Sequence, residues 1–204
     1  MPSIYDIKPA FQNLLRPLTR ALAAGGVTAN QVTLAAAALS VAVGAAIAWA
    51  PTQRWPLLVV PGFLFVRMAL NAIDGMLARE HGMKSRLGAV LNEIGDVVAD
   101  SALYLPFALV PGFSPTLVVT IVILAVVSEM TGVVAVQIGA TRRYDGPMGK
   151  SDRAFWFGLM ALLAGLGVPL QPVLPFALAV MAALLGLTIV NRARRALAEV
   201  PPAT

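Results

Sequence analysis

Hydrophobic residues along the chain form one amphipathic stretch followed by six long apolar segments. Over residues 3–22, apolar side chains recur at helical spacing, which predicts an amphipathic helix at a membrane interface, with Pro9 or Pro17 as the position of any break. The apolar positions there are Ile4, Ile7, Phe11, Leu14, Leu15, Leu18 and Leu22. The six segments lie at about 31–50, 56–79, 88–111, 115–139, 153–168 and 171–191. Because a helix of about 20 apolar residues crosses a bilayer, the pattern predicts six transmembrane helices.

The composition agrees with a chain that is surrounded by lipid. Of the 204 residues, 58% are hydrophobic and 12% are charged, and the mean hydropathy is +0.80. Soluble domains have roughly 45–50% apolar and about 25% charged residues, so the composition argues against a soluble enzyme or binding module. The chain has no cysteine and only one histidine, His81, which excludes thiolate and multi-histidine metal sites. We therefore predict an all-α integral membrane fold of six transmembrane helices preceded by an N-terminal amphipathic interfacial helix.

The distribution of basic residues predicts the orientation in the membrane. Of the 15 Lys and Arg residues, 13 precede the first segment, follow the sixth, or lie between segments two and three or four and five. They are Lys8, Arg16, Arg20, Arg79, Lys84, Arg86, Arg142, Arg143, Lys150, Arg153, Arg192, Arg194 and Arg195. The positive-inside rule then places both termini and the two larger loops in the cytoplasm. We expect a cytoplasmic-face helix and lead-in at 1–30, a transmembrane domain at 31–195 and a flexible tail at 196–204.

Polar and acidic residues gather where the second apolar segment ends and the third begins. Asn71 and Asp74 are three residues apart, and Asn92, Asp96 and Asp100 follow one another at intervals of four, so each set shares one helix face. Ionisable residues inside a bilayer cost about 2.5–3.5 kcal/mol each at its centre, so such a cluster needs a reason. If the two segments form a hairpin, the faces converge on an oxygen-rich pocket near the cytoplasm. Oxygen ligands suit hard cations such as Mg²⁺, Mn²⁺ or Ca²⁺.

The spacing of these residues resembles the signature of the CDP-alcohol phosphatidyltransferase family. That signature is D-x-x-D-G-x-x-A-R, eight residues, then G-x-x-x-D-x-x-x-D, and all its spacings match this chain over 26 residues. Six of the eight defining positions also match in identity: Asp74, Gly75, Ala78, Arg79, Gly88 and Asp96. Residues 28–33 are similar to the family's Pro-Asn-x-x-Thr element, with Ala29 in place of the proline. The chain looks closest to the class I, YnbA-like branch.

The resemblance implies a membrane enzyme of phospholipid biosynthesis that depends on a divalent metal. In the family, the hydroxyl of an alcohol attacks the phosphorus of a CDP-linked lipid such as CDP-diacylglycerol, and CMP leaves. The acceptor is an alcohol or a phosphorylated alcohol. Carried over, the general base is Asp96, and one or two Mg²⁺ or Mn²⁺ ions bind at Asn71, Asp74, Asn92 and Asp96. The CDP moiety contacts Asn30, Gly75, Ala78, Arg79, Ser85 and Gly88.

Two metal positions depart from the family because they carry amides, Asn71 and Asn92, in place of carboxylates. A neutral amide oxygen binds a divalent cation more weakly than a carboxylate does. Three outcomes stay open. The enzyme works with one metal, or binds a second only with the substrate pyrophosphate; Glu93 or Asp100 takes over as a ligand; or the site is inactive. Asp100 shares the face of Asp96, whereas Glu93 lies about 100° away around the helix.

The basic loop between the fourth and fifth segments is the candidate site for the phosphate of an acceptor. Its cations are Arg142, Arg143, Lys150 and Arg153, and related enzymes commonly have a Gly-Lys pair like residues 149–150. The alternative is that these residues only mark topology near anionic headgroups. Inside the apolar segments, Glu129 either lines the polar site or pairs with Arg67. Asp100 is either an extra metal ligand or a hydrogen-bonded structural acid.

Two other functions compete with the transferase. A catalytically silent relative would bind a CDP-lipid or a protein partner, and the two asparagines motivate that reading. A small ion-coupled transporter would need acids at the bilayer midplane, whereas the acids here gather near one end of their segments. Nucleic-acid binding is not supported, because the basic residues lie where topology places them. The resemblance further implies a homodimer in a bacterial-type inner (plasma) membrane, in contact with membrane lipid.

Overall fold

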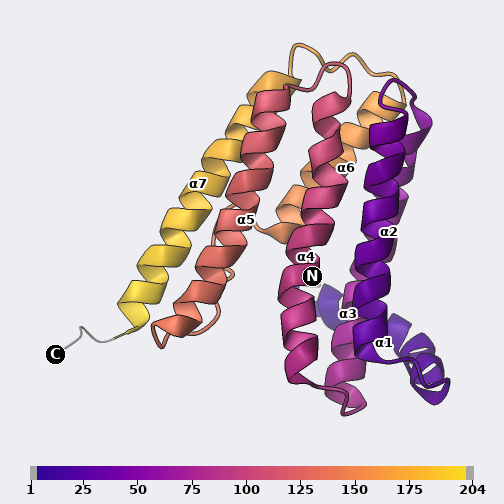
Figure 1. Cartoon of the computed structure of the whole chain (residues 1–204), viewed down its shortest axis with the longest axis vertical. Coiled ribbons are helices and arrows are strands. Elements are labelled where there is room, and N and C mark those ends of the chain that lie inside the picture. Colours follow the sequence, from indigo (N-terminus) through magenta and orange to yellow (C-terminus); the bar gives the residue numbers. More distant parts are fainter. Residues whose placement is uncertain (1–3, 201–204) are drawn as a thin grey trace. The chain divides into compact units, whose positions relative to one another are not determined.

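The computed structural model describes the backbone of residues 4–200 and the side chains of residues 9–200, and within that range it is all helical (Figure 1). No strand occurs among these residues, which agrees with the all-α prediction. The helices are α1 (Ile4–Ala24), α2 (Ala29–Trp49), α3 (Trp55–Glu80), α4 (Arg86–Tyr104), α5 (Pro115–Gln137), α6 (Lys150–Gly165) and α7 (Leu174–Glu199), with a short 3₁₀ helix, η1 (Leu105–Leu109), after α4.

Each of the six predicted apolar segments overlaps one α-helix, from α2 to α7, and the third segment also covers η1. A helix, α1, also covers the predicted amphipathic stretch, and it continues through both Pro9 and Pro17 without a break. Packing of its apolar side chains on the neighbouring core offsets the hydrogen bonds that the prolines remove; Leu15 and Leu22 lie in that contact. Its position at a membrane interface stays a prediction.

The C-terminal end of the last helix corrects the predicted boundaries. The apolar pattern ended near residue 191 and assigned 196–204 to a flexible tail, but α7 continues to Glu199. The reason is a tertiary contact, because the Glu199 carboxylate accepts hydrogen bonds from the backbone N–H and the hydroxyl of Thr141, each at 3.0 Å. This contact anchors the last turn. Residues 201–204 lie outside the described residues.

Within residues 4–200, four helices are long and apolar enough to cross a membrane: α2, α3, α5 and α7. The other two predicted spans do not reach that standard. Helix α6 has only 16 residues, fewer than the roughly 20 that span a bilayer. Helix α4 has 19 residues and carries three carboxylates, at Glu93, Asp96 and Asp100. Length and composition therefore support four spans directly. The prediction of six spans also requires that α4, with its polar residues, and the short α6 cross the membrane.

The chain divides into two compact units, and unit 1 comprises residues 1–42 and 62–100. Its core is an apolar cluster of Ala29, Val32, Ile73 and Leu77, which joins the start of α2 to the C-terminal half of α3. Helix α1 packs on the same cluster and is also tied to α3 by an exposed ion pair between Arg16 and Glu80, at 3.0 Å. Helices α1 and α2 therefore both pack on the C-terminal half of α3, and this half carries the α3 residues of the motif.

Unit 2 comprises residues 43–61 and 101–204, and its main contact is the pairing of α5 with α7, which lie side by side (Figure 1). A cluster of aromatic rings packs at its centre. Tyr104 stacks on Phe157 with 4.4 Å between ring centroids, and Phe107 meets Phe157 edge to face at 5.2 Å. Helix α2 also approaches the end of α4 very closely at Gly44, where a Cβ atom would overlap the carbonyl oxygen of Ala102. These contacts join α4, η1 and α6 to one another and the end of α2 to α4, while α5 pairs with α7.

Candidate functional site

The motif residues of unit 1 lie on one stripe of α3 and one stripe of α4. On α3, Arg67, Asn71 and Asp74 are four and three residues apart, which places them on the same helix face. On α4, the stripe consists of Asn92, Asp96 and Asp100. Burial increases from one end to the other, since Asn92 is exposed, the Asp96 side chain is 32% exposed and Asp100 is buried. Their polar groups thus run from the exposed start of α4 to a buried end.

Asp74 is fixed by a neighbour on α2. The hydroxyl of Thr33 donates a 2.8 Å hydrogen bond to Asp74 Oδ2, and Asp74 is only 7% exposed. Thr33 belongs to the Thr28–Thr33 stretch that resembles a family element, so its role in holding Asp74 gives that element a structural meaning. A carboxylate held by a hydroxyl donor has a defined orientation, which a metal ligand needs.

Asp96 and Asp100 are connected to α3 through Arg67. The guanidinium lies 2.6 Å from Asp100 Oδ1 and 3.9 Å from Asp96 Oδ1, and Arg67 is 3% exposed. The sequence offered Arg67 as a partner for Glu129, and this option is wrong. Arg67 pairs with Asp100, whereas Glu129 pairs with arginines of unit 2. Asp100 thus lies in a buried ion pair, the structural role that sequence reasoning left open for it.

The two motif glycines allow polar groups to approach the helices closely. A Cβ atom on Gly75 would lie 2.9 Å from Arg79 Nη2, so the Arg79 guanidinium lies back along α3 over this glycine. A Cβ atom on Gly88 would lie 2.7 Å from Asn30 Oδ1 and 3.0 Å from Ser85 Oγ. The Ser85 hydroxyl also accepts a 2.9 Å hydrogen bond from the Gly88 N–H at the start of α4.

Five of the six positions expected to contact the CDP moiety therefore form two close groups, one of Gly75 and Arg79 and one of Asn30, Ser85 and Gly88. The sixth, Ala78, packs against the apolar cluster of Ala29, Val32, Ile73 and Leu77. Ala78 therefore contributes to the packing of α3 on α2.

The donor set on the two stripes fits a hard divalent cation when the amides contribute. It consists only of oxygens, from the carboxylates of Asp74 and Asp96 and the amides of Asn71 and Asn92. Among residues 9–200, no three His, Cys, Asp or Glu side chains come together as a metal-binding group. A cation held on these stripes would therefore use the amide oxygens as well as the carboxylates.

A second polar cluster, in unit 2, surrounds Glu129 on α5. Three guanidiniums meet this carboxylate: Arg142 at 3.1 Å, Arg153 at 3.2 Å and Arg192 at 3.4 Å. Arg153 and Arg192 are each 1% exposed. Arg192 also donates to the backbone oxygens of Ser128, at 2.6 Å, and Asp145, at 3.2 Å. The four side chains carry a formal charge of +2 in a largely buried place.

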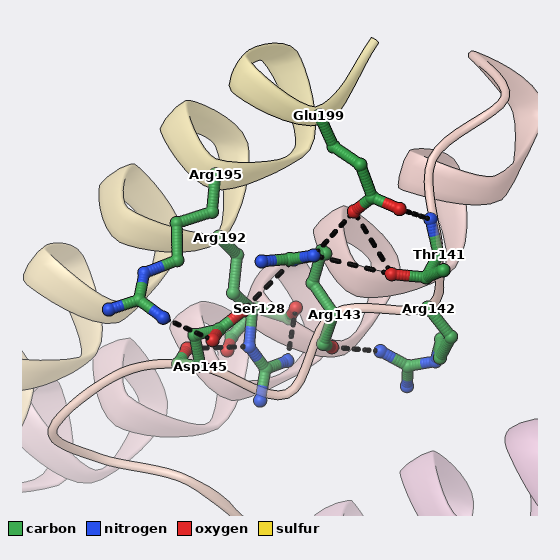
Figure 2. A network of polar contacts seen from close by, with 8 residues as sticks. All are labelled: Ser128, Thr141, Arg142, Arg143, Asp145, Arg192, Arg195 and Glu199. Atoms are coloured by element: carbon green, nitrogen blue, oxygen red, sulfur yellow. Dashed lines mark hydrogen bonds and ion pairs between the residues drawn. The ribbon is translucent and has the colours of Figure 1, made fainter.

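This cluster contains two of the four residues that the sequence predicted for an acceptor site. Arg142 and Arg153 belong to it, as the sequence suggested, but Arg143 turns to Asp145 at 2.9 Å and to Glu199 at 2.5 Å (Figure 2). Lys150 begins α6 at a half-buried position. Sequence reasoning missed Arg192, which it treated only as a topology signal. The signal that could have found it is Glu129, because an acid in an apolar helix needs cationic partners.

The Asp145 carboxylate lies beside this cluster, in the loop before α6, and accepts from Arg143 and from Arg195 at 2.8 Å (Figure 2). Burial raises the pKa of Asp145, but the positive charges of Arg143 and Arg195 lower it by more, so the pKa lies below its ordinary value. Asp145 is thus ionised at neutral pH and ties the loop to α7.

The fold and the α3–α4 stripes together define an all-helical protein with membrane-length apolar helices and a set of polar and acidic side chains on two of its helices. The family model of the CDP-alcohol phosphatidyltransferases matches residues 26–191. The chain is 49% identical over 170 residues to Inner membrane protein YnbA of Escherichia coli (strain K12), covering 83% of this chain and 82% of that protein. It is 30% identical over 181 residues to a phosphatidylinositol phosphate synthase of Mycolicibacterium smegmatis, covering 86% of this chain and 78% of that enzyme.

Solved structures agree on the fold. The Mycobacterium tuberculosis phosphatidylinositol phosphate synthase PgsA1 with CDP-DAG bound matches with a TM-score of 0.75 and 22% identity, over 88% of this chain and 92% of that chain. The same enzyme in complex with manganese and citrate also matches with a TM-score of 0.75, over 89% of this chain and 88% of that chain. The chain therefore belongs to the CDP-alcohol phosphatidyltransferase family. The predicted resemblance, including its YnbA-like character, is confirmed.

Proposed function

We propose that this protein transfers a phosphatidyl group from a CDP-diacylglycerol-like donor to a phosphorylated alcohol and releases CMP, in a bacterial-type inner (plasma) membrane. The observation that carries this proposal is that unit 1 contains the residues on the family's spacing: Thr33 holds Asp74, Arg67 lies near Asp96, and Arg79 lies over Gly75. The relatives support the donor and the membrane, since one is a structure with CDP-DAG bound and another is an inner membrane protein.

The reaction is a substitution at phosphorus. The acceptor hydroxyl forms a new bond to the phosphorus that carries the lipid, the bond from that phosphorus to the CMP oxygen breaks, and the hydroxyl proton goes to Asp96. Asp96 suits the role of base because its side chain is 32% exposed, so an acceptor hydroxyl can reach the carboxylate. The positively charged Arg67 guanidinium also lies near this carboxylate. A divalent cation held by Asn71, Asp74, Asn92 and Asp96 would neutralise pyrophosphate oxygens, and a Mn²⁺ complex of a relative supports divalent metal dependence.

Two groups of residues are proposed to hold the CDP moiety. Arg79, lying over Gly75, can donate paired hydrogen bonds to a phosphate. Asn30, Ser85 and Gly88 meet at the N-terminus of α4, where polar groups and the helix dipole favour an anion or a polar ligand. Asn71, Glu93 and Asp100 complete the polar surroundings of the site; Asp100 holds Arg67 in place.

The acceptor phosphate is proposed to bind at the arginine cluster of unit 2. Arg142, Arg153 and Arg192 outnumber Glu129, so the cluster carries a formal +2 that matches a phosphate dianion. Arginine is suited to this role because its planar fork can bind two phosphate oxygens at once. Arg143 and Lys150 would lie at the edge of such a site.

In the membrane, we propose that α4 and α6 cross together with the four apolar helices, which gives six spans with both termini in the cytoplasm. The amphipathic α1 would lie at the cytoplasmic face, where Arg16 and Arg20 meet anionic headgroups. Polar residues of α4 would then face protein rather than lipid, as intramembrane acids do in general. The active form is proposed to be a homodimer, which the family resemblance implies.

The decisive test is CMP release by the purified protein in detergent micelles with CDP-diacylglycerol. The assay compares Mg²⁺ or Mn²⁺ with a chelated control across alcohols and phosphorylated alcohols. Metal-dependent CMP release that requires one phosphorylated acceptor is the expected result. CDP-lipid binding without CMP release from any acceptor would reject the transferase and favour the silent relative that Asn71 and Asn92 suggest.

Two substitutions on α7 test the acceptor site. Arg192→Lys should raise the KM for the phosphorylated acceptor at least tenfold with little change in kcat, because it loses the paired hydrogen bonds to phosphate. Arg195→Lys is the matched control, since Arg195 is more exposed and binds Asp145. Equal effects of both variants on KM would remove the arginine cluster from the proposal.

A further inference from the structure

The inner ends of the two motif stripes are joined by a buried cation that belongs to the protein. Arg67 lies one turn before Asn71 on α3, and Asp100 lies one turn after Asp96 on α4. The guanidinium is 2.6 Å from Asp100 and 3.9 Å from Asp96, and Arg67 is 3% exposed. A fixed positive charge therefore stands directly beside the expected metal ligands.

The charges on the stripes determine how many divalent ions they can neutralise. The pattern of the family has four carboxylates at the metal positions, whereas Asn71 and Asn92 are neutral here. Asp100 does not replace the missing charge, because its ion pair with Arg67 is neutral as a unit. Asp74 and Asp96 remain, with two formal negative charges, which balance one divalent ion. A second ion would add a charge of +2 close to Arg67.

We infer that, without substrate, this site binds one divalent cation because only Asp74 and Asp96 keep an unbalanced negative charge, and that Arg67, neutralised by Asp100, is a positioning residue that orients Asp96. The inference rests on the proposed function in that it takes the two stripes to be the metal site. Asp100 serves to hold Arg67 and is not a metal ligand. Anionic oxygens from a pyrophosphate would be required before a second ion could enter.

Counting Mn²⁺ ions tests the first part. The full-length protein in detergent micelles, without substrate, is titrated with Mn²⁺, and free Mn²⁺ is measured by electron paramagnetic resonance. Wild type should bind one ion per chain, and Asn71→Asp/Asn92→Asp should bind two, because two carboxylates are added. Asn13→Asp, which adds a carboxylate at an exposed position of α1, should stay at one ion. Two ions in the wild type, or one in the double variant, overturns the inference.

A rescue experiment tests the part played by Arg67. Asp100→Asn should weaken Mn²⁺ binding at least tenfold, because it leaves the Arg67 charge unbalanced beside Asp96. Arg67→Gln/Asp100→Asn removes both charges and should restore the affinity to within threefold of wild type. If Asp100 were a metal ligand, the double variant would remain as weak as Asp100→Asn. Glu80→Gln, an exposed change on α3, is the control that should not alter affinity.

Failure of this inference can be told apart from failure of the proposed function. Two Mn²⁺ ions in the wild type, together with metal-dependent CMP release, would reject only the single-ion site. Absence of Mn²⁺ binding by the wild type would reject the metal site on these stripes, and with it both proposals. If Asp100→Asn does not fold, the comparison of wild type with Asn71→Asp/Asn92→Asp still decides the number of ions.

Discussion

The carboxylate of Glu129 is expected to stabilise unit 2 because three arginines converge on it. Glu129→Gln keeps the shape of the side chain and removes its charge, leaving three guanidiniums near one another with no carboxylate at their centre. The distances are 3.1 Å to Arg142, 3.2 Å to Arg153 and 3.4 Å to Arg192. At an effective dielectric constant of about 20, each pair has a Coulomb energy of about 5 kcal/mol before desolvation is counted.

The net loss of stability is smaller than the sum of these energies. Desolvation opposes them, and Arg192 keeps its bonds to the backbone oxygens of Ser128 and Asp145. Breaking a buried ion pair by removing one partner costs about 3–5 kcal/mol, and we expect Glu129→Gln to lower the free energy of unfolding by that amount. For a chain of this size the thermal midpoint then falls by roughly 6–20 °C.

Thermal unfolding of the purified variant in detergent, followed by tryptophan fluorescence, measures this effect. Inorganic phosphate should restore part of the lost stability, because its oxygens can replace the missing carboxylate among the arginines. Glu80→Gln is the control: its ion pair with Arg16 is exposed, so the midpoint should stay close to that of wild type. A Glu129→Gln midpoint within 2 °C of wild type would refute the reasoning about the cluster.

Three further predictions concern the base, the packing and the loop. Asp96→Asn should abolish CMP release while leaving the thermal midpoint near wild type, as measured in the CMP assay and by melting. Gly44→Ala should lower the free energy of unfolding by about 1–3 kcal/mol or more, because the added methyl overlaps the backbone carbonyl of Ala102. Asp145→Asn should destabilise the protein at neutral pH. Since the folded pKa of Asp145 is lowered, its contribution is present above about pH 4 and is lost as pH falls through the folded pKa.

Each of these has a matched control and a contradicting result. Glu80→Gln should keep full turnover, and normal turnover in Asp96→Asn would remove Asp96 from the mechanism. Gly186→Ala, on α7 with open space around the added methyl, should be neutral or slightly stabilising; a similar loss in both glycine variants would contradict the packing argument. For Asp145→Asn, a difference from wild type that does not shrink below about pH 4 would contradict the charge-based explanation.

Helix positions and the membrane class followed from the sequence because they depend on local patterns. The apolar segments needed only their length and spacing, and each overlaps a helix of the structure. The motif needed only its spacing, because the 3.6-residue period puts Asn71 with Asp74, and Asn92 with Asp96 and Asp100, on shared faces. The family assignment followed from the same residues.

The partners of the buried charges were decided by the tertiary structure alone. The sequence offered Arg67 as a partner for Glu129, but the fold pairs Arg67 with Asp100 and surrounds Glu129 with arginines from the following loop, α6 and α7. Arg192 lies 63 residues after Glu129 in the chain, and no local pattern relates them. Likewise, α7 extends to Glu199 because Thr141 binds that residue. Local periodicity determines which face a side chain occupies, whereas the packing of helices distant in sequence determines which opposite charge it meets.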